Sequence, residues 1–162
     1  MNQILGFTGH RPKSLPGKYS EQTYQALLDT ADFVLFQYRP DAVISGMALG
    51  WDTAIAEVAV RQGIDLIAAV PFQGQESQWP VASRNKYLYL LSQARHVEIV
   101  TTEGYNSYAM QLRNEWIVNH CHQLVALWHR GSGGTARCVD YALQTNRPCW
   151  NVWGTFMHFY QV

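Results

Sequence analysis

Short runs of apolar residues alternate along this chain with longer segments in which apolar residues recur every three or four positions. Short continuous runs are typical of strands buried on both faces of a sheet, whereas the longer spacing predicts amphipathic helices. The expected strands cover residues 4–8, 42–45, 65–70, 96–100, 124–128 and 149–153. The expected helices cover residues 21–39, 53–62, 81–94, 107–121 and 135–145.

The order of these elements predicts the fold class. Continuous apolar strands separated by helices of ordinary length imply βαβ crossovers, and such crossovers build a mostly parallel sheet with helices on both faces. We therefore expect an α/β, Rossmann-like fold. The length of 162 residues suits a single domain that spans residues 1–162.

Polar and glycine residues mark the expected helix ends. Ser20, Asp52 and Ser107 are the expected N-caps, because their side-chain oxygens can accept a hydrogen bond from a free N–H of the first turn. Pro40 and Gly63 are expected to close the first two helices.

The C-terminal segment, residues 150–162, is unusually apolar. It carries Trp153, Phe156, Met157, Phe159 and Tyr160. A small domain does not leave that much apolar surface in water. Two placements remain open: the segment packs over the edge of the sheet, or it forms a subunit interface in a homo-oligomer.

The charge balance restricts the classes of partner. Twelve Lys and Arg residues face twelve Asp and Glu residues, so the formal net charge is zero. Without a general basic surface, we do not expect binding to a nucleic acid or to an anionic membrane. Nine of the twelve cationic residues are arginines, which grip phosphate or carboxylate through a planar fork. We therefore expect a small anion held at one local site.

Cysteines and hydropathy indicate the compartment. No stretch approaches 18 uninterrupted apolar residues, and the first residues show no charged leader before a long apolar run. Cys121, Cys138 and Cys149 are odd in number and lack CxxC spacing, which favours reduced thiols over disulfides or structural zinc. We expect a cytoplasmic protein without a cofactor or a metal ion.

Three loops that contain glycine follow predicted strands. Carboxyl ends of parallel strands share one sheet edge, where helix N-termini offer unpaired N–H groups to an anion. Glycine lets the backbone approach a phosphate closely, although a tight turn also uses glycine for its geometry alone. The candidate ligand-binding residues in these loops are Thr8, Gly9, Arg11, Ser45, Gly46, Gly50, Asp52, Gly133, Gly134 and Thr135.

A buried arginine is expected on the helix at residues 107–121. Arg113 shares one helix face with Met110, Ile117 and Cys121, so it interrupts an apolar stripe. A buried guanidinium needs a partner, either an internal carboxylate or an external anion. The GSGGT loop that follows the next predicted strand favours an external anion, with a structural salt bridge as the alternative.

Three further residues complete the candidate site. Asn114 stands next to the predicted buried arginine. Arg84 can add charge to the same cleft, with a solvated helix surface as the equal alternative. Trp79 can stack on a base, although packing in the core is the more common role of a tryptophan.

Four segments together resemble a known group of proteins. They are GFTGHRP, ISGMALGWDTAIAEVA, PFQGQESQWP and MQLRNEWIVNHCHQLVALWHRGSGGTARCVDYA. In this order they resemble the YpsA-like branch of the SLOG superfamily, and the resemblance covers nearly the whole chain. That superfamily includes DprA-like DNA-processing proteins and the LOG phosphoribohydrolases, which release a base from a nucleoside monophosphate. The resemblance implies a Rossmann-like domain that binds nucleotides or their derivatives.

The resemblance also bears on catalysis. LOG enzymes pair a helix arginine with a later Gly-Gly-x-Gly-Thr-x-x-Glu loop. Arg113 and the run Gly133, Gly134 and Thr135 match that pattern, but Cys138 stands where the glutamate is expected. A thiol cannot replace a carboxylate that stabilises an oxocarbenium-like centre.

The implied function is therefore binding without turnover. The ligand would be nucleotide-derived, such as an ADP-ribose-like molecule or a cyclic nucleotide signal, and the protein a sensor or a sequestering sponge. Some members of the superfamily in bacterial and phage conflict systems recognise NAD-derived signals. The alternative is a LOG-like N-glycosidase that acts on a nucleoside monophosphate.

Overall fold

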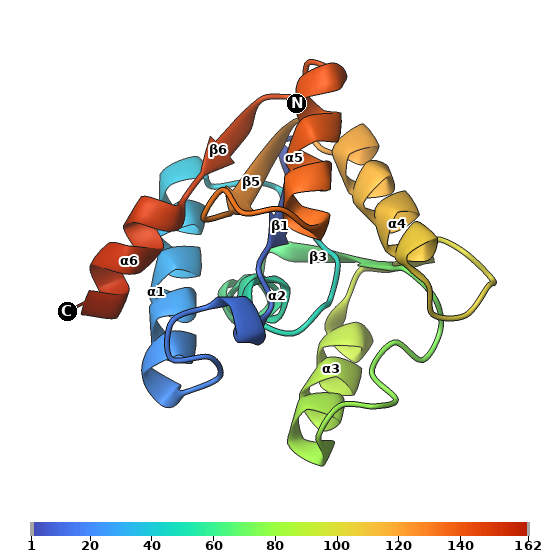
Figure 1. Cartoon of the computed structure of the whole chain (residues 1–162), viewed down its shortest axis with the longest axis horizontal. Helices are drawn as coiled ribbons and strands as arrows, with labels where there is room; N and C mark the ends of the chain where they lie inside the picture. The colour runs from blue at the N-terminus through green and yellow to red at the C-terminus, as the bar shows by residue number, and fades with distance from the viewer. Residues whose placement is uncertain (1, 162) are drawn as a thin grey trace.

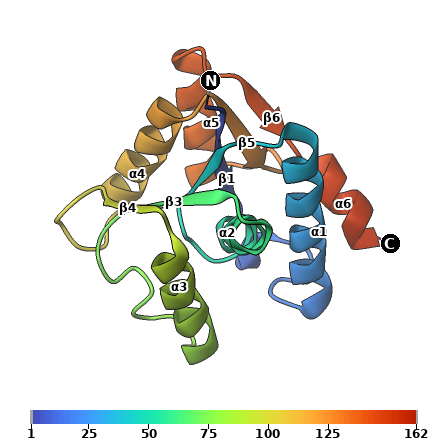
Figure 2. The ribbon, with the colours of Figure 1, turned by 180° about the vertical axis from the view of Figure 1, so that it is seen from behind.

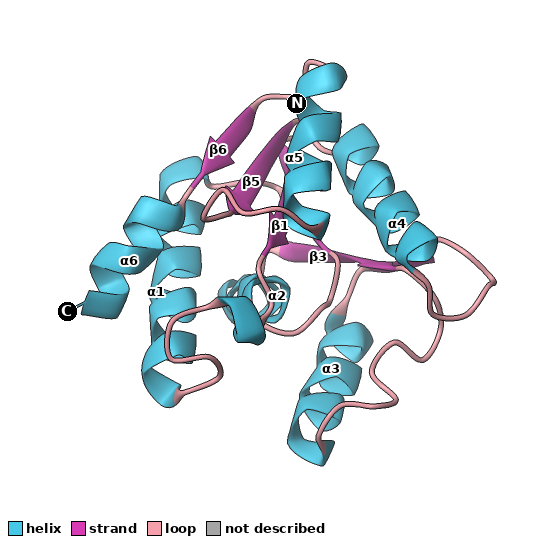
Figure 3. Ribbon diagram, in the orientation of Figure 1, coloured by secondary structure: helices cyan, strands magenta, loops and turns pink. Residues whose placement is uncertain are grey.

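In residues 2–161 a single six-stranded sheet forms the centre of the fold, and six α-helices surround it (Figures 1 and 3). The computed structural model describes residues 2–161. The strands are β1 (Ile4–Gly9), β2 (Ala42–Ser45), β3 (Asp65–Val70), β4 (His96–Ile99), β5 (Gln123–Leu127) and β6 (Cys149–Asn151). The helices are α1 (Glu21–Tyr38), α2 (Trp51–Gln62), α3 (Val81–Gln93), α4 (Ser107–His120), α5 (Gly134–Gln144) and α6 (Trp153–Gln161), with a short 3-10 turn at Pro12–Ser14.

The strand order is β4-β3-β2-β1-β5-β6, and every pair of neighbouring strands is parallel. Leu5 in β1 lies opposite Val43 of β2 on one side and opposite Gln123 of β5 on the other. The chain builds outward from β1 to β4 and then returns across the sheet to begin β5 beside β1. The predicted α/β, Rossmann-like class is therefore confirmed, and β1 and β5 flank the point where the strand order reverses.

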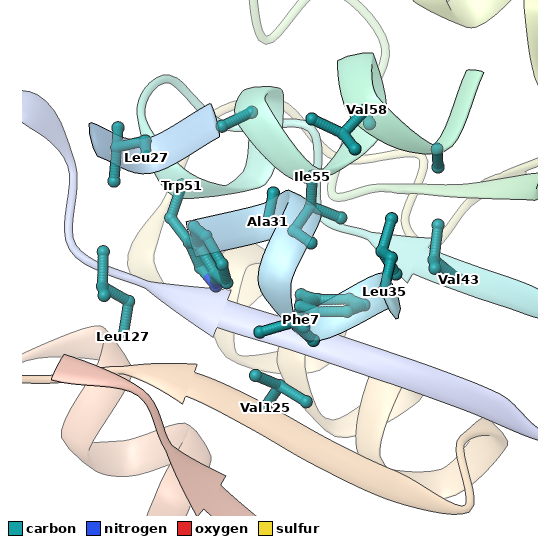
Figure 4. Close-up of a cluster of buried hydrophobic side chains, with 14 of the residues drawn as sticks. Phe7, Leu27, Ala31, Leu35, Val43, Trp51, Ile55, Val58, Val125 and Leu127 are labelled. Atoms are coloured by element: carbon teal, nitrogen blue, oxygen red, sulfur yellow. The ribbon is translucent and has the colours of Figure 1, made fainter. Parts of the chain in front are cut away.

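Helices cover both faces of the sheet, as predicted. Helices α1, α2 and α6 lie on one face with α3 beside α2, while α4 and α5 lie on the other (Figures 1 and 2). On the first face Phe7 and Trp51 are completely buried and meet edge to face, with ring centroids 6.0 Å apart (Figure 4). On the second face Ile117, Cys121 and Cys138 belong to a separate buried cluster. Within residues 2–161 no helix is both long enough and apolar enough to span a bilayer.

The helix ends follow the sequence only in part. Ser20 caps α1 as predicted, because its Oγ accepts a hydrogen bond from the N–H of Thr23 at 3.2 Å. Gly63 ends α2 with a φ of 73°, also as predicted. The predicted cap at Asp52 is wrong, because α2 begins at Trp51, two residues before the predicted start, and its N-cap is Gly50 with a φ of 92°. The Asp52 carboxylate is thereby moved into the first turn of the helix.

The predicted N-cap of α4, Ser107, is wrong by one residue. Asn106, in extended conformation, accepts a hydrogen bond at Oδ1 from the N–H of Ala109 at 2.6 Å, and Ser107 is the first helical residue. Asparagine and serine are about equally good at this position, so the sequence alone does not separate the two.

The C-terminal segment ends differently from the expectation. The last strand stops at Asn151, Val152 belongs to neither element, and Trp153, which was expected to end the strand, begins helix α6 instead. Phe156 of α6 is fully buried, and α6 packs against α1, where Gln22 donates to the backbone carbonyl of Tyr160 at 2.8 Å. The apolar side chains of this segment are therefore used within the chain.

A test of the packing between β1 and α4 uses Gly6. A Cβ at Gly6 would lie 2.7 Å from Ile117 Cγ2 and 2.9 Å from Cys121 Sγ, both of which are buried. Gly6→Val should therefore lower the free energy of unfolding by about 1–3 kcal/mol in urea denaturation. Gly154→Val is the control, because a Cβ there meets nothing within 4 Å, and it should change stability by less than about 0.5 kcal/mol. Equal stability of the two variants would contradict the packing.

Candidate functional site

A cavity of about 370 Å³ lies at the carboxyl edge of the sheet, where the loops after β1 and β5 meet the N-terminal half of α4. Four cationic side chains and one carboxylate line it. They are Arg11, Lys13, Arg113, Arg137 and Asp52. Because the whole chain has no net charge, this lining is a local concentration of positive charge, which suits an anion.

Helix α5 begins at this cavity. Its N-cap is Gly133, which has a φ of 132° and provides no side-chain cap, and Gly134 and Thr135 form the start of the first turn. All three residues line the cavity, together with Thr8 and Gly9 at the end of β1. Free N–H groups at a helix N-terminus carry partial positive charge and point along the axis toward an anion. The arrangement can hold a phosphate group.

The guanidinium of Arg113 is held in the wall of the cavity. Arg113 is only 5% exposed; its Nη1 donates to the carbonyl of Gly46 at 2.6 Å and its Nε to Asn114 Oδ1 at 2.8 Å. Its Nη2 has the sulfur of Met110 at 3.9 Å, which is a weak acceptor. Within residues 2–161 no carboxylate lies at ion-pairing distance from Arg113. Nη2 therefore keeps donor capacity for a ligand.

A buried carboxylate stands beside this arginine. Asp52 is 6% exposed; its Oδ2 accepts the N–H of Ala48 at 3.3 Å, and its Oδ1 has no partner. Burial raises the pKa of Asp52, and the charge of Arg113 acts in the opposite direction. Both side chains press against Gly46, where a Cβ would lie 2.5 Å from Arg113 Nη1 and 2.8 Å from Asp52 Oδ2. The absence of a side chain at Gly46 makes their approach possible.

His10 links the loop after β1 to the loop after β5. Its Nε2 accepts the N–H of His129 at 3.0 Å, and the two rings stack with centroids 3.9 Å apart. Burial and the neighbouring His129 lower the pKa of His10 to about 4, so its ring is uncharged at neutral pH. His10 therefore contributes to the shape of the cavity and adds no positive charge to it.

A second cavity, of about 320 Å³, adjoins the first. The two share Arg11, Tyr105 and Met110 in their linings. Aromatic rings and amide side chains dominate the rest of the second cavity, among them Phe72, Gln75, Gln78 and Trp79. This mixture suits a flat, partly polar group such as a nucleobase, next to the more cationic first cavity.

Most of the sequence-predicted candidates come together in the first cavity. Nine line it: Thr8, Gly9, Arg11, Asp52, Arg113, Asn114, Gly133, Gly134 and Thr135. Ser45, Gly46 and Gly50 lie outside its lining but support it; for example, Ser45 is fully buried and its Oγ donates to the Asp52 carbonyl at 2.7 Å. Trp79 lines the second cavity, where it meets the ring of Tyr87 edge to face. Arg84 lines neither cavity.

Sequence reasoning missed several residues of the lining. Arg137 follows Gly134 by three positions, so it lies one helical turn above the loop, and that spacing could have identified it. Lys13 and His10 flank the predicted Arg11 in the first loop, but their directions depend on the turn at Pro12–Ser14. Gly9 also has a packing reason for being glycine, because a Cβ there would lie 2.5 Å from Trp51 Cδ1.

Cys138, the residue in place of the expected glutamate, lies outside the lining of the cavity. Its side chain is fully buried between α5 and its neighbours, and burial raises the pKa of the thiol to about 12. A hydrogen bond with the Thr8 side chain acts against that rise. Cys138 is therefore an uncharged packing residue at neutral pH.

Solved structures share this architecture. The chain matches DNA processing protein A (DprA) of Streptococcus pneumoniae with a TM-score of 0.68 and 18% identity, over 99% of this chain and 56% of that one. It also matches DNA processing protein A of Helicobacter pylori with a TM-score of 0.62 and 15% identity, over 91% of this chain and 63% of that one. That structure concerns the binding of single-stranded DNA by the Helicobacter protein. The match to the molybdenum cofactor carrier protein of Chlamydomonas reinhardtii has a TM-score of 0.57 and 14% sequence identity, and it covers 99% of this chain and 84% of that one. At these identities the likeness concerns the fold alone.

Relatives found by sequence have higher identity to this chain than these solved structures. A UPF0398 protein of Halalkalibacterium halodurans is 35% identical over 99 residues, which cover 57% of this chain and 52% of that protein. The SPbeta prophage-derived protein YoqJ of Bacillus subtilis is 29% identical over 120 residues, 63% of this chain and 69% of that one. This chain thus spans about half to two thirds of these relatives. The model of the YspA SLOG family (YpsA) matches residues 5–159, and the chain therefore belongs to the YpsA SLOG family.

Proposed function

We propose that this chain binds a nucleotide-derived small molecule through its phosphate groups and acts as a sensor or a sequestering protein without turning the ligand over. One observation carries the proposal: the uncapped N-terminus of α5 and four cationic side chains face the same cavity. Molecules of the ADP-ribose or cyclic-nucleotide type carry both the phosphate and the base for which the two adjoining cavities are suited.

The phosphate would lie at the start of α5. There the backbone N–H groups of Gly134 and Thr135 are directed at the anion, and Arg11 and Arg113 supply full positive charges from two other elements. Charge-assisted hydrogen bonds of this kind contribute about 1.5–3 kcal/mol each. The base would lie in the second cavity, against Trp79.

The distribution of charge supports a small molecule over a nucleic acid strand. A strand needs a basic stripe along its backbone, whereas this chain has zero net charge and gathers four cationic side chains around one cavity of about 370 Å³. DprA of Helicobacter pylori binds single-stranded DNA, and the Chlamydomonas neighbour carries the molybdenum cofactor. Those ligands also contain phosphate, so a phosphate-binding role is consistent with both.

A LOG-like phosphoribohydrolase is the second candidate function, and Asp52 is the observation that favours it. Among residues 2–161, Asp52 is the only carboxylate in the lining of the first cavity. It comes from α2, whereas the missing glutamate would come from the position of Cys138 on α5. Binding remains the preferred proposal because Asp52 does not occupy the place of that glutamate.

A substitution at the start of α5 tests the phosphate position. Gly134→Val places a branched side chain in the path of a phosphate, and it should weaken ADP-ribose or AMP binding at least about tenfold by calorimetry. Gly154→Val is the matched control, because both glycines are exposed and lie in the first turn of a helix. A Cβ at Gly154 would meet nothing within 4 Å, and one at Gly134 would meet only Arg137 Nη2, at 3.9 Å. If the two variants bind alike, the start of α5 does not contact the ligand.

Turnover separates the two candidate functions. Incubated with excess AMP, a catalytic amount of the protein should release no free adenine beyond a blank, because loss of a catalytic carboxylate commonly costs about a hundredfold or more in rate. The measurement is chromatography of the free base over many binding lifetimes. Catalytic release of adenine that disappears in Asp52→Asn would instead establish the hydrolase.

A further inference from the structure

We infer that Asp52 selects the sugar of the ligand, so that the site accepts ribonucleotides and discriminates against deoxyribonucleotides. The inference rests on the proposed nucleotide-binding function and adds the class of nucleotide. It assigns the unpartnered, buried carboxylate of Asp52 to a hydroxyl group of a ribose.

Asp52 has hydrogen-bond acceptor positions that its own chain does not fill. In its ionised form, which the charges of Arg113 and Arg11 favour and burial disfavours, Asp52 donates nothing and offers about four acceptor positions. The structure fills one of them, through the N–H of Ala48 at 3.3 Å, and leaves Oδ1 without a partner. A buried acceptor without a donor is costly, and Asp52 reaches the cavity as part of its lining. A ligand that places a donor there would satisfy it.

The parts of a nucleotide differ in whether they can donate a hydrogen bond to the Asp52 carboxylate. Phosphate oxygens are acceptors and carry negative charge, so they are repelled by Asp52 and belong with the cationic residues and the start of α5. Ribose hydroxyls are neutral and can donate. Base N–H groups can donate too, but the base is placed in the second cavity, so the Asp52 carboxylate in the lining of the first cavity is left for the ribose hydroxyls.

The position of Asp52 relative to the two cavities also favours the sugar. The carbonyl of Gly46 accepts Arg113 Nη1 at 2.6 Å from the side of the first cavity and Gln75 Nε2 at 3.3 Å from the side of the second. Asp52 packs on the same Gly46. Asp52 lines the first cavity only, but the charge of Arg11, which lines both cavities, acts on its carboxyl group. We therefore place the sugar, which lies between phosphate and base in a nucleotide, beside Asp52.

A deoxyribonucleotide would leave this acceptor unpaired. A site built to hydrogen-bond a hydroxyl rejects an analogue without it more strongly than an apolar pocket rejects a missing methylene group, because the buried polar group is then unsatisfied. The expected preference is about ten- to a hundredfold for a hydrogen bond to a charged group.

The experiment compares AMP with 2′-deoxy-AMP and 3′-deoxy-AMP by calorimetry on the unmodified protein. At least one deoxy analogue should bind about tenfold or more weakly than AMP. In Asp52→Asn this ratio should shrink toward about threefold or less, because a neutral acceptor makes a weaker hydrogen bond. Inorganic pyrophosphate, which has no sugar, should bind Asp52→Asn as well as or better than the parent, because a like charge has been removed.

The outcomes are distinct. Equal binding of AMP and both deoxy analogues by the unmodified protein would overturn the inference and leave nucleotide binding intact, and this comparison needs no variant. Parallel weakening of AMP and pyrophosphate in Asp52→Asn, with an unchanged ribose preference, would show that Asp52 has only a structural role. Failure of every nucleotide to bind, with or without the hydroxyls, would refute the proposed function and this inference with it.

Discussion

The return of the chain across the sheet after β4 is the constraint on which the site depends. It places β5 beside β1, so that the loops leaving these two strands lie next to each other and both line the cavity. Because all strands are parallel, the start of α5 opens into that space with its N–H groups free. The cavity is thus a product of topology, and the side chains then determine its charge.

Burial of opposite charges without a direct ion pair is the second notable feature. Leaving a charged group buried and unpaired costs several kcal/mol. Arg113 avoids much of this cost through the carbonyl of Gly46 and the amide of Asn114, whereas Asp52 keeps an unpartnered oxygen. A site that is incompletely satisfied by its own chain is what ligand binding requires, because the ligand supplies the missing partners.

The sequence predicted the fold well and the site partly, for physical reasons. The six predicted strands and the five predicted helices lie within two residues of the observed elements, because buried strands are continuous apolar runs and helices have apolar residues every three or four positions. Arg113 was identified because it interrupts an apolar stripe. Helix caps were harder, since neighbouring polar residues compete for one N-cap. Helix α6 was not predicted at all, because its first residue, Trp153, fits the end of the apolar run 149–153. The joining of the two cavities depends on how distant loops meet, which a local pattern does not contain.

The central claim is that this cavity recognises phosphate at the start of α5. The most direct measurement is calorimetric titration of the unmodified protein with AMP and with adenosine, each at low and high salt. The account predicts that adenosine binds at least about a hundredfold more weakly and that only the affinity for AMP falls with salt, because the charge-assisted contacts belong to the phosphate. Equal affinity for AMP and adenosine, independent of salt, would contradict it.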